Sequence, residues 1–416
     1  MSSALQKLAV NGGPKAVGEI APRGLFGVEE KRAVDALFDK CIATGQVFGY
    51  NGEEEEAYCR EFAAFFGGGY ADAVNSGTTA VYVALRALDI EPYGEVIVSP
   101  VTDPGGVMPI PLCGLIPVPA DSAPNSYNVG PEQIEARITK RTRAIVAAHI
   151  AGYPCDMGPI MEIAKARNLL VVEDCAQAHG AKWRGRYVGT FGHANAFSTM
   201  SGKHHATGAQ GGVVFTKDEA TYWRARRSSD RGKPFGLKGV ATNVVCALNL
   251  NSNDLASCIG RVQLKKLPKI VAARRRSALK IGEGLRGLKA TRLMPELPKC
   301  ESAFWFLFVR LDLDKFSVDK TTLVKALKAE GVPADESYLH LWPRAEWYKK
   351  RAVFGKTGWP WTAPEYKGNP DQEYPTPNVI AADNTHIRVA FHESVSLKTA
   401  GQIVKAFAKV EAAYLK

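Results

Sequence analysis

Three short segments of the sequence combine side chains that could bind an anion and exchange a proton. The first, residues 75–80, reads Asn-Ser-Gly-Thr-Thr-Ala and stands between an apolar strand pattern and an apolar helix pattern. The free N–H groups at the start of that helix, together with two hydroxyls, could face a phosphate. Ser76 or Gly77 could equally serve only to cap the helix.

The second segment places two carboxylates and an amide directly after a buried strand. Glu173, Asp174 and Gln177 follow the apolar pair Val171-Val172, at the strand end where α/β sheets form a ligand crevice. Successive side chains of a strand point to opposite faces, so only one of the two acids can face a ligand. We expect Glu173 to be a structural carboxylate bonded to backbone N–H groups.

The third segment contains a single lysine in a run of small and polar residues. Lys203 follows Ser201-Gly202 and precedes a glycine-rich stretch that leads into the apolar strand 213–216. A surface lysine is the ordinary interpretation, but such lysines usually lie on helix faces. The adjacent His204 and His205 lack a third ligand at metal spacing, so we expect no metal site.

The segments are separated by alternating strand and helix patterns. Amphipathic helices are expected at 29–42 and 53–66. The expected strands are 70–74, 95–99, 115–119, 144–149 and 169–173, and the expected helices between them are 78–88, 131–138 and 160–167. Strands joined through helices predict a largely parallel sheet, whose carboxyl edge would collect the three segments.

A different pattern begins near residue 270. A strand at 304–311, a helix at 320–328, a strand at 386–391 and a helix at 397–414 predict a smaller α+β domain. We therefore expect an N-terminal arm (1–20), a large domain (21–270) and a small domain (271–416). The stretch 342–377 shows little periodicity and predicts a long ordered loop. Its tryptophans could line a substrate mouth or pack in a core.

The composition restricts the function classes. The chain has 416 residues, a formal net charge of +11 and eight scattered cysteines, which favours anionic ligands and a reducing cytoplasm. No apolar run is long enough to cross a membrane, and no secretory signal is visible. The basic runs 224–227 and 274–276 lack interleaved aromatic residues, so we interpret them as solvated helix faces and expect no nucleic-acid partner.

Taken together, the motifs resemble those of the DegT/DnrJ/EryC1/StrS sugar aminotransferases, which are fold-type I pyridoxal phosphate enzymes. The similarity covers most of the chain. It includes N-S-G-T at 75–78, E-D-x-A-Q-x-H-G at 173–180, F-S-x-x-x-G-K at 197–203, G-x-x-G-G at 208–212, L-A-V-N-G-G at 8–13, H-x-x-G-x-x-x-D-M at 149–157, Q-L-K-K-L at 263–267 and Tyr-Leu-His at 338–340. The resemblance implies a mixed, mostly parallel seven-stranded sheet sandwiched by helices.

The resemblance also implies roles for individual residues. Lys203 would be the Schiff-base lysine that holds pyridoxal 5'-phosphate and moves a proton, and Asp174 would keep the ring nitrogen charged. Gln177 would hold the phenolic oxygen of the ring. The phosphate would be bound by Gly77, Thr78, Thr79 and Ser198, with Asn249 reaching it from the other subunit of a homodimer.

Two positions depart from the family pattern. The family usually has an aromatic residue that stacks on the cofactor ring in a P-S-x-T-aromatic stretch, whereas this chain has Asp103 there. The family's N-x-R-M-S-E segment reads Asn249-Leu-Asn-Ser-Asn-Asp here, so Asn251 replaces an expected arginine. The sequence therefore leaves two points open: which residue stacks on the cofactor ring, and which residue takes the place of the arginine in substrate recognition.

The resemblance implies transfer of an amino group from glutamine or glutamate to a keto-sugar or keto-cyclitol by a ping-pong mechanism. Related sugar dehydratases replace the lysine with histidine, but here the fifth residue after Ser198 is Lys203. A catalytically silent regulator or partner protein with the same fold is a further alternative, suggested by Asp103 and Asn251. A nicotinamide-dependent enzyme is disfavoured, because no G-x-G-x-x-G follows an early strand.

Overall fold

The strands expected in the first half of the chain form one sheet. The computed structural model describes residues 3–338 and 340–416, and its largest sheet has the order β1-β9-β8-β5-β4-β2-β3. The strands are β1 (Tyr70–Val74), β2 (Glu95–Val98), β3 (Ile116–Pro119), β4 (Thr142–Ala148), β5 (Leu170–Asp174), β8 (Ala194–Ser198) and β9 (Gly212–Thr216). Strand β9 is antiparallel to both of its neighbours, and the other pairs are parallel. The expected mixed, mostly parallel seven-stranded sheet is confirmed.

Helices cover both faces of this sheet. Val213 and Phe215 of β9 pack in one apolar cluster with α3 (Glu53–Phe65), whereas Val214 packs in another with α4 (Gly77–Ala87). Because alternate residues of a strand point to opposite faces, a strand that is apolar at every position must be buried on both sides. The other helices of this part are α5 (Pro109–Leu112), α6 (Pro131–Glu135), α7 (Met157–Ala166) and α8 (Glu219–Ser229).

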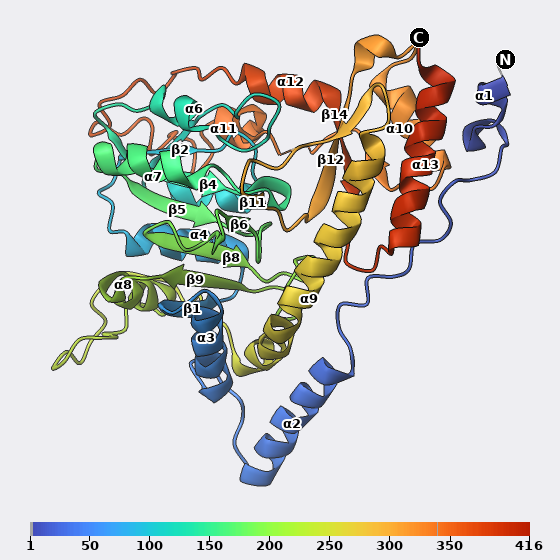
Figure 1. Ribbon diagram of the computed structural model, residues 1–416. Helices are drawn as coiled ribbons and strands as arrows, with labels where there is room; N and C mark the ends of the chain where they lie inside the picture. The colour runs from blue at the N-terminus through green and yellow to red at the C-terminus, as the bar shows by residue number, and fades with distance from the viewer. Residues whose placement is uncertain (1–2, 339) are drawn as a thin grey trace.

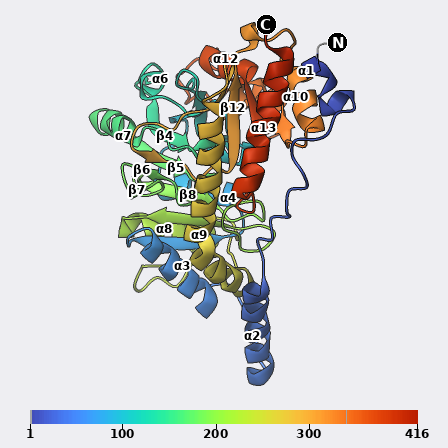
Figure 2. The same cartoon turned by 45° about the vertical axis from the view of Figure 1, so that its right-hand side comes forward.

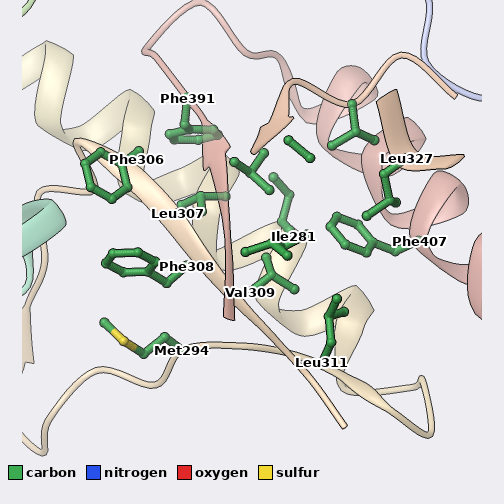
Figure 3. Close-up of a cluster of buried hydrophobic side chains, with 14 of the residues drawn as sticks. Ile281, Met294, Phe306, Leu307, Phe308, Val309, Leu311, Leu327, Phe391 and Phe407 are labelled. Atoms are coloured by element: carbon green, nitrogen blue, oxygen red, sulfur yellow. The ribbon is translucent and has the colours of Figure 1, made fainter. Parts of the chain in front are cut away.

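A second sheet is antiparallel throughout. Its order is β10 (Thr291–Leu293), β12 (Phe306–Leu311), β14 (His386–Ala390) and β13 (Ala334–Asp335). Leu307 and Val309 of β12 pack in one core with Leu327 of α10 (Lys320–Ala329) and Phe407 of α13 (Leu397–Tyr414) (Figure 3). A small third sheet consists of β11 (Cys300–Glu301), β6 (Lys182–Trp183) and β7 (Arg186–Tyr187).

One long helix connects the two main sheets. Helix α9 (Asp254–Leu285) has 32 residues and runs from the base of the large sheet to the small sheet (Figures 1 and 2). Leu264 and Leu267 pack in the α3 cluster, and Ala278 and Ile281 pack in the core of the small sheet. Residue 270 therefore lies inside a helix, and the division into 21–270 and 271–416 stays a prediction.

The interpretation of the basic runs as solvated helix faces is wrong for Arg274. Its side chain is 1% exposed and pairs with Glu393, while Arg276 remains exposed. A helix turns about 100° per residue, so consecutive arginines point in different directions and one of three can face the interior. In the other run, Arg226 of α8 pairs with the buried Asp72 at 3.3 Å.

The stretch 342–377 is largely irregular and is partly packed into the core. It contains η5 (Trp342–Arg344) and α11 (Glu346–Lys349), and α12 (Pro377–Thr385) follows it. Trp361 is buried in the α4 cluster, and Nε1 of Trp342 donates to the carbonyl of Ser99 at 2.7 Å. Leu339, in the middle of the Tyr-Leu-His motif, lies outside the described residues.

The N-terminal arm lies against the small sheet's helices before α2 (Val28–Thr44) projects from the body of the molecule (Figure 2). The carboxylate of Glu330 fixes the arm, because it accepts from the N–H groups of Ala9 and Ala16. All eight cysteines are free thiols. Among residues 3–338 and 340–416, no helix combines the length and the apolar character needed to cross a membrane.

Candidate active site

The first expected segment forms the N-terminus of α4. Ser76 is the N-cap, and its Oγ accepts from the backbone N–H of Thr79 at 3.1 Å. A Cβ on Gly77 would stand 2.5 Å from the Cβ of Ser198, so only glycine allows the helix to start this close to β8. Capping and anion binding are compatible here, because the cap uses one N–H group of the first turn and leaves others free.

The two acids at the end of β5 have different partners. Glu173 is fully buried and accepts from the N–H groups of Gly189, Phe191 and Gly192 and from Nε2 of His149. The expectation that Glu173 is a structural carboxylate is confirmed. Asp174 instead lines a cavity on the other side of the strand.

Lys203 lies in a turn that follows β8, and its side chain is buried. The turn is held by backbone bonds from Thr199 to Gly211 and from Lys203 to Met200. The residue is only 6% exposed, which excludes a surface lysine. Burial lowers the pKa of Lys203 to about 8, against the opposing attraction of Asp174 and Asp103. About a tenth of this amine is therefore unprotonated at pH 7, and about half at pH 8.

One cavity of about 220 Å³ collects most of the expected residues. Gly77, Thr78, Asp174, Ser198 and Lys203 all line it. It lies at the carboxyl ends of β5 and β8 and beside the start of α4, which is the edge expected from the strand order. Burial raises the pKa of Asp174 above its usual range, and the bond from the N–H of Ala176 opposes this shift.

The turn 103–106 forms one wall of the cavity. It contains Asp103, the residue that stands where the family usually has a stacking aromatic residue. Oδ1 of Asp103 accepts from the N–H of Gly105 at 3.0 Å and begins η2 (Pro104–Gly106). A Cβ on Gly105 would stand 2.4 Å from Oγ1 of Thr78, and one on Gly106 would stand 2.7 Å from Oδ2 of Asp174. The two glycines therefore bring backbone against both ends of the cavity.

Three of the expected residues do not line this cavity. Gln177 is buried beside it, where its Oε1 accepts from the N–H of Ala151 and its Nε2 donates to the hydroxyl of Tyr338. The hydroxyl of Thr79 donates to Oδ1 of Asn75 at 2.7 Å. Asn249 is exposed, and its Oδ1 accepts from Nδ2 of Asn251.

A second cavity of about 400 Å³ lies next to the first. Thr102 and Pro104 line it on one side, and Trp342 and Trp347 line it on the other. Tyr338 also lines it, and its hydroxyl accepts from Nε2 of Gln177. Of the two readings of the tryptophans, core packing holds for Trp361, whereas Trp342 and Trp347 contribute to a cavity wall.

Sequence reasoning missed Trp305, which covers the reactive end of Lys203. The Nζ of Lys203 lies 3.9 Å from the centroid of the indole ring. In the sequence Trp305 belongs to an aromatic strand pattern, and nothing in that pattern distinguishes a residue that meets a lysine about a hundred positions away.

The residues present fit pyridoxal phosphate. A partly deprotonated amine suits its aldehyde, a buried carboxylate suits its charged ring nitrogen, and a helix N-terminus with Thr78 suits its phosphate. The glycines at 77, 105 and 106 leave the cavity open where a Cβ would fill it. Asp103 is the one wall residue that differs from the family pattern.

Comparison with known proteins agrees with this chemistry. The model of the DegT/DnrJ/EryC1/StrS aminotransferase family matches residues 29–363. GDP-perosamine synthase of Caulobacter vibrioides is 33% identical over 68% of this chain and 76% of its own length. The dTDP-3-amino-3,4,6-trideoxy-alpha-D-glucose transaminase of Streptomyces venezuelae is 32% identical over 71% and 78%.

The fold comparison extends over nearly the whole chain. The structure of an aminotransferase from Psychrobacter cryohalolentis superposes with a TM-score of 0.81 at 29% identity, covering 95% of this chain and 99% of that one. The expected fold type and cofactor are thus confirmed. The chain belongs to the DegT/DnrJ/EryC1/StrS aminotransferase family and is a pyridoxal-phosphate-dependent aminotransferase of fold type I.

Proposed function

We propose that this aminotransferase moves an amino group from glutamine or glutamate to a keto-sugar or keto-cyclitol, with Lys203 at the centre of a ping-pong exchange. The observation that carries the proposal is the shared cavity of Lys203, Asp174 and the α4 N-terminus. The names of the aminosugar-forming relatives support a keto-sugar acceptor. The Gly202-Lys203 pair resembles the branch of the family that acts on cyclitol ketones, and this supports a keto-cyclitol.

Bound pyridoxal phosphate supplies an aldehyde that takes up the amino group and a ring that withdraws electrons from the adjacent carbon. Nζ of Lys203 would hold the aldehyde end of the cofactor. The same Nζ would move the proton in both halves of the exchange, taking one from the donor carbon and returning one to the acceptor carbon. Its pKa of about 8 suits both directions of transfer near neutral pH.

The other cavity residues hold the group in place. The carboxylate of Asp174 would bind the ring nitrogen and favour its charged form. The hydroxyls of Thr78 and Ser198 and the N–H groups at Gly77 and Thr78 would bind the phosphate, whereas the N–H of Thr79 is used by the Ser76 cap. Gln177 has a second amide hydrogen beyond the one given to Tyr338, and this hydrogen would be available to the phenolic oxygen.

We also propose a homodimer in which Asn249 completes the phosphate site of the partner. Large apolar side chains are exposed on α2 and on the segment 237–248, among them Val28 (61%), Ile42 (78%) and Leu248 (61%). Exposed apolar surface of this extent is typical of protein interfaces. We place the enzyme in the cytoplasm, where free thiols stay reduced.

The acceptor would enter the second cavity. Trp347 and Tyr338 offer aromatic faces to the C–H face of a sugar or cyclitol ring, and Thr102, Arg344 and Asp383 offer polar partners for hydroxyl groups. The dehydratase alternative lacks support, because a lysine stands at the position where those enzymes have histidine. The silent-protein alternative rests on Asp103 and Asn251 alone.

The test is the donor half-reaction. Purified protein loaded with pyridoxal phosphate is mixed with L-glutamine or L-glutamate, and the absorbance of the bound aldehyde form is followed. We expect this absorbance to fall with each donor that is used and to return when a keto-cyclitol or a nucleotide-linked keto-sugar is added. A loaded protein whose spectrum no amino donor changes would support the silent alternative.

A further inference from the structure

Trp305 contacts Lys203 in two ways. Its indole ring lies over Nζ at 3.9 Å from the ring centroid, and its Nε1 donates to the carbonyl of Gly202 at 3.0 Å. The face of an indole ring attracts a cation, and this attraction is strongest where water is excluded. Lys203 is 6% exposed, so water is largely excluded from this contact.

The backbone of Trp305 is fixed by the turn 150–152, which follows β4. Its N–H donates to the carbonyl of Ala151 at 2.8 Å, and the N–H of Ala303 donates to Gly152 at 2.9 Å. Gly152 has φ +85°, and a Cβ there would stand 2.7 Å from the backbone nitrogen of Phe304. Glycine at 152 therefore permits the close approach that places the indole over the lysine.

An ion-pair network holds the same two residues from the other side. The guanidinium of Arg23 donates to the carbonyl of Lys203 at 2.5 Å and pairs with Glu393 at 2.9 Å. Glu393 also pairs with the buried Arg274 at 2.8 Å, and Arg274 donates to the carbonyl of Trp305 at 3.1 Å. The contacts form a closed ring that runs from Lys203 through Arg23, Glu393, Arg274 and Trp305 back to Lys203.

From this geometry we propose that Trp305 is a positioning residue for Lys203: its ring holds the protonated amine at a fixed place beside the cofactor cavity. The proposal rests on the proposed role of Lys203 in proton transfer. The indole face attracts only the ammonium form. The indole ring of Trp305 therefore stabilises the protonated amine and no longer attracts it once the proton has been transferred.

Other charged groups also face Lys203 and set the background for this effect. Asp174 and Asp103 raise the pKa of Lys203, while burial lowers it more strongly. His179 is buried nearby with a pKa held well below its usual range by burial, so it contributes no charge near neutral pH. The guanidinium of Arg23 contacts the backbone of Lys203. Replacing the indole by another apolar side chain leaves these charged groups in place.

The test measures the ionisation of Lys203 directly and needs no substrate. The full chain is freed of cofactor, because a bound aldehyde would block Nζ, and is treated with an amine-acylating reagent over a series of pH values; labelling of Lys203 is quantified by mass spectrometry. In Trp305→Leu we expect the labelling midpoint to move down by roughly 0.5 to 1.5 pH units, because the ammonium loses its aromatic partner.

Trp183→Leu is the matched control. Trp183 also lies over a cation, Arg184 at 4.5 Å, and its Nε1 donates to Asp156 at 2.8 Å. It does not contact Lys203, so this variant should keep the wild-type midpoint. An unchanged midpoint in Trp305→Leu, or an equal shift in Trp183→Leu, would overturn the proposal.

A second measurement covers the case in which Trp305→Leu fails to fold. Fluorinated tryptophans keep the shape of the indole and withdraw electron density from its face. With increasing fluorination the labelling midpoint should fall stepwise in the wild-type sequence and stay constant in Trp305→Phe, which no longer carries an indole at 305. A midpoint independent of fluorination contradicts the proposal. Failure of the proposed function would appear separately, as a loaded wild-type protein that no amino donor converts.

Discussion

Glu173 and Asp174 are neighbours on β5, and their carboxylates point to opposite sides of the strand. Glu173 is saturated by three backbone N–H groups and His149, whereas Asp174 lines the cavity that contains Lys203. The end of β5 thus supplies one carboxylate that stabilises the fold and a second that faces the cavity. We therefore expect substitution of Glu173 to lower stability and substitution of Asp174 to lower turnover.

Glu173→Ala should destabilise the protein. It leaves three N–H groups without an acceptor in the interior, at a cost of about 3 kcal/mol or more in the free energy of unfolding. Urea unfolding followed by circular dichroism measures this quantity. Glu173→Gln, which keeps one acceptor oxygen, should lose less. Equal stabilities for Ala, Gln and wild type would contradict the structural role.

Asp174→Asn should affect turnover rather than folding. The amide is nearly isosteric but cannot hold the ring nitrogen in its charged form, so kcat should fall by roughly 100-fold or more. Steady-state kinetics of the loaded enzyme measure the loss, and the unfolding free energy should stay near that of wild type. A variant with wild-type kcat would exclude Asp174 as the partner of the ring nitrogen.

The burial of Lys203 predicts a pH dependence of stability. Without cofactor its pKa is about 8 in the folded protein and 10.5 in the unfolded chain. The folded state binds fewer protons between these values, so its contribution to stability rises with pH across this window. Below pH 8 the buried ammonium costs about 3 kcal/mol.

Lys203→Met should therefore be more stable than wild type at pH 7, by up to that amount, and should gain nothing above pH 10.5. The same variant should have no turnover and no absorbance from covalently bound cofactor. Unfolding in urea at the two pH values checks the first statement. A Met variant that retained turnover would refute the assignment of Lys203.

Glu393→Gln should be costly, because it leaves Arg274 buried without a carboxylate. Breaking a buried ion pair from one side typically costs about 3–5 kcal/mol. The double variant Arg274→Met with Glu393→Gln removes both charges and should lose less than Glu393→Gln alone. If the double variant were as unstable as the sum of Arg274→Met and Glu393→Gln, the pair would not be energetically coupled.

Trp347→Ala should weaken binding of the acceptor and leave the donor half-reaction unchanged. The indole lines the second cavity, and its loss should raise KM for the acceptor roughly tenfold or more. Trp359, which does not line this cavity, provides the control: Trp359→Ala should keep the wild-type KM. A slower donor half-reaction in Trp347→Ala would place Trp347 in the cofactor site instead.

The sequence predicted the large sheet well because its signals are local. Short apolar strands such as 70–74 and 170–174 sit between turns and amphipathic helices, and each pattern can be recognised within a few residues. The alternation of a strand was enough to separate Glu173 from Asp174. The cavity residues at 77, 174, 198 and 203 followed from the order of the strands and from the family motifs.

Contacts between distant segments could not be predicted in this way. Trp305 meets Lys203, and Arg274 meets Glu393, only because α9 and the turn at Gly152 bring the two sheets together. A run of three arginines has the same local signal whether one of them is buried or not. The proposed role of Asn249 depends on a second subunit, whose position a single chain does not encode locally.

Helix α9 has a practical consequence for engineering. Its first half is embedded against α3, and its second half is embedded in the core of the antiparallel sheet. A chimera that exchanges the C-terminal portion with a relative should therefore take the entire span 254–285 from one parent. A junction placed at residue 270 would join, within one helix, the half of one parent that packs against α3 to the half of the other parent that packs on the antiparallel sheet.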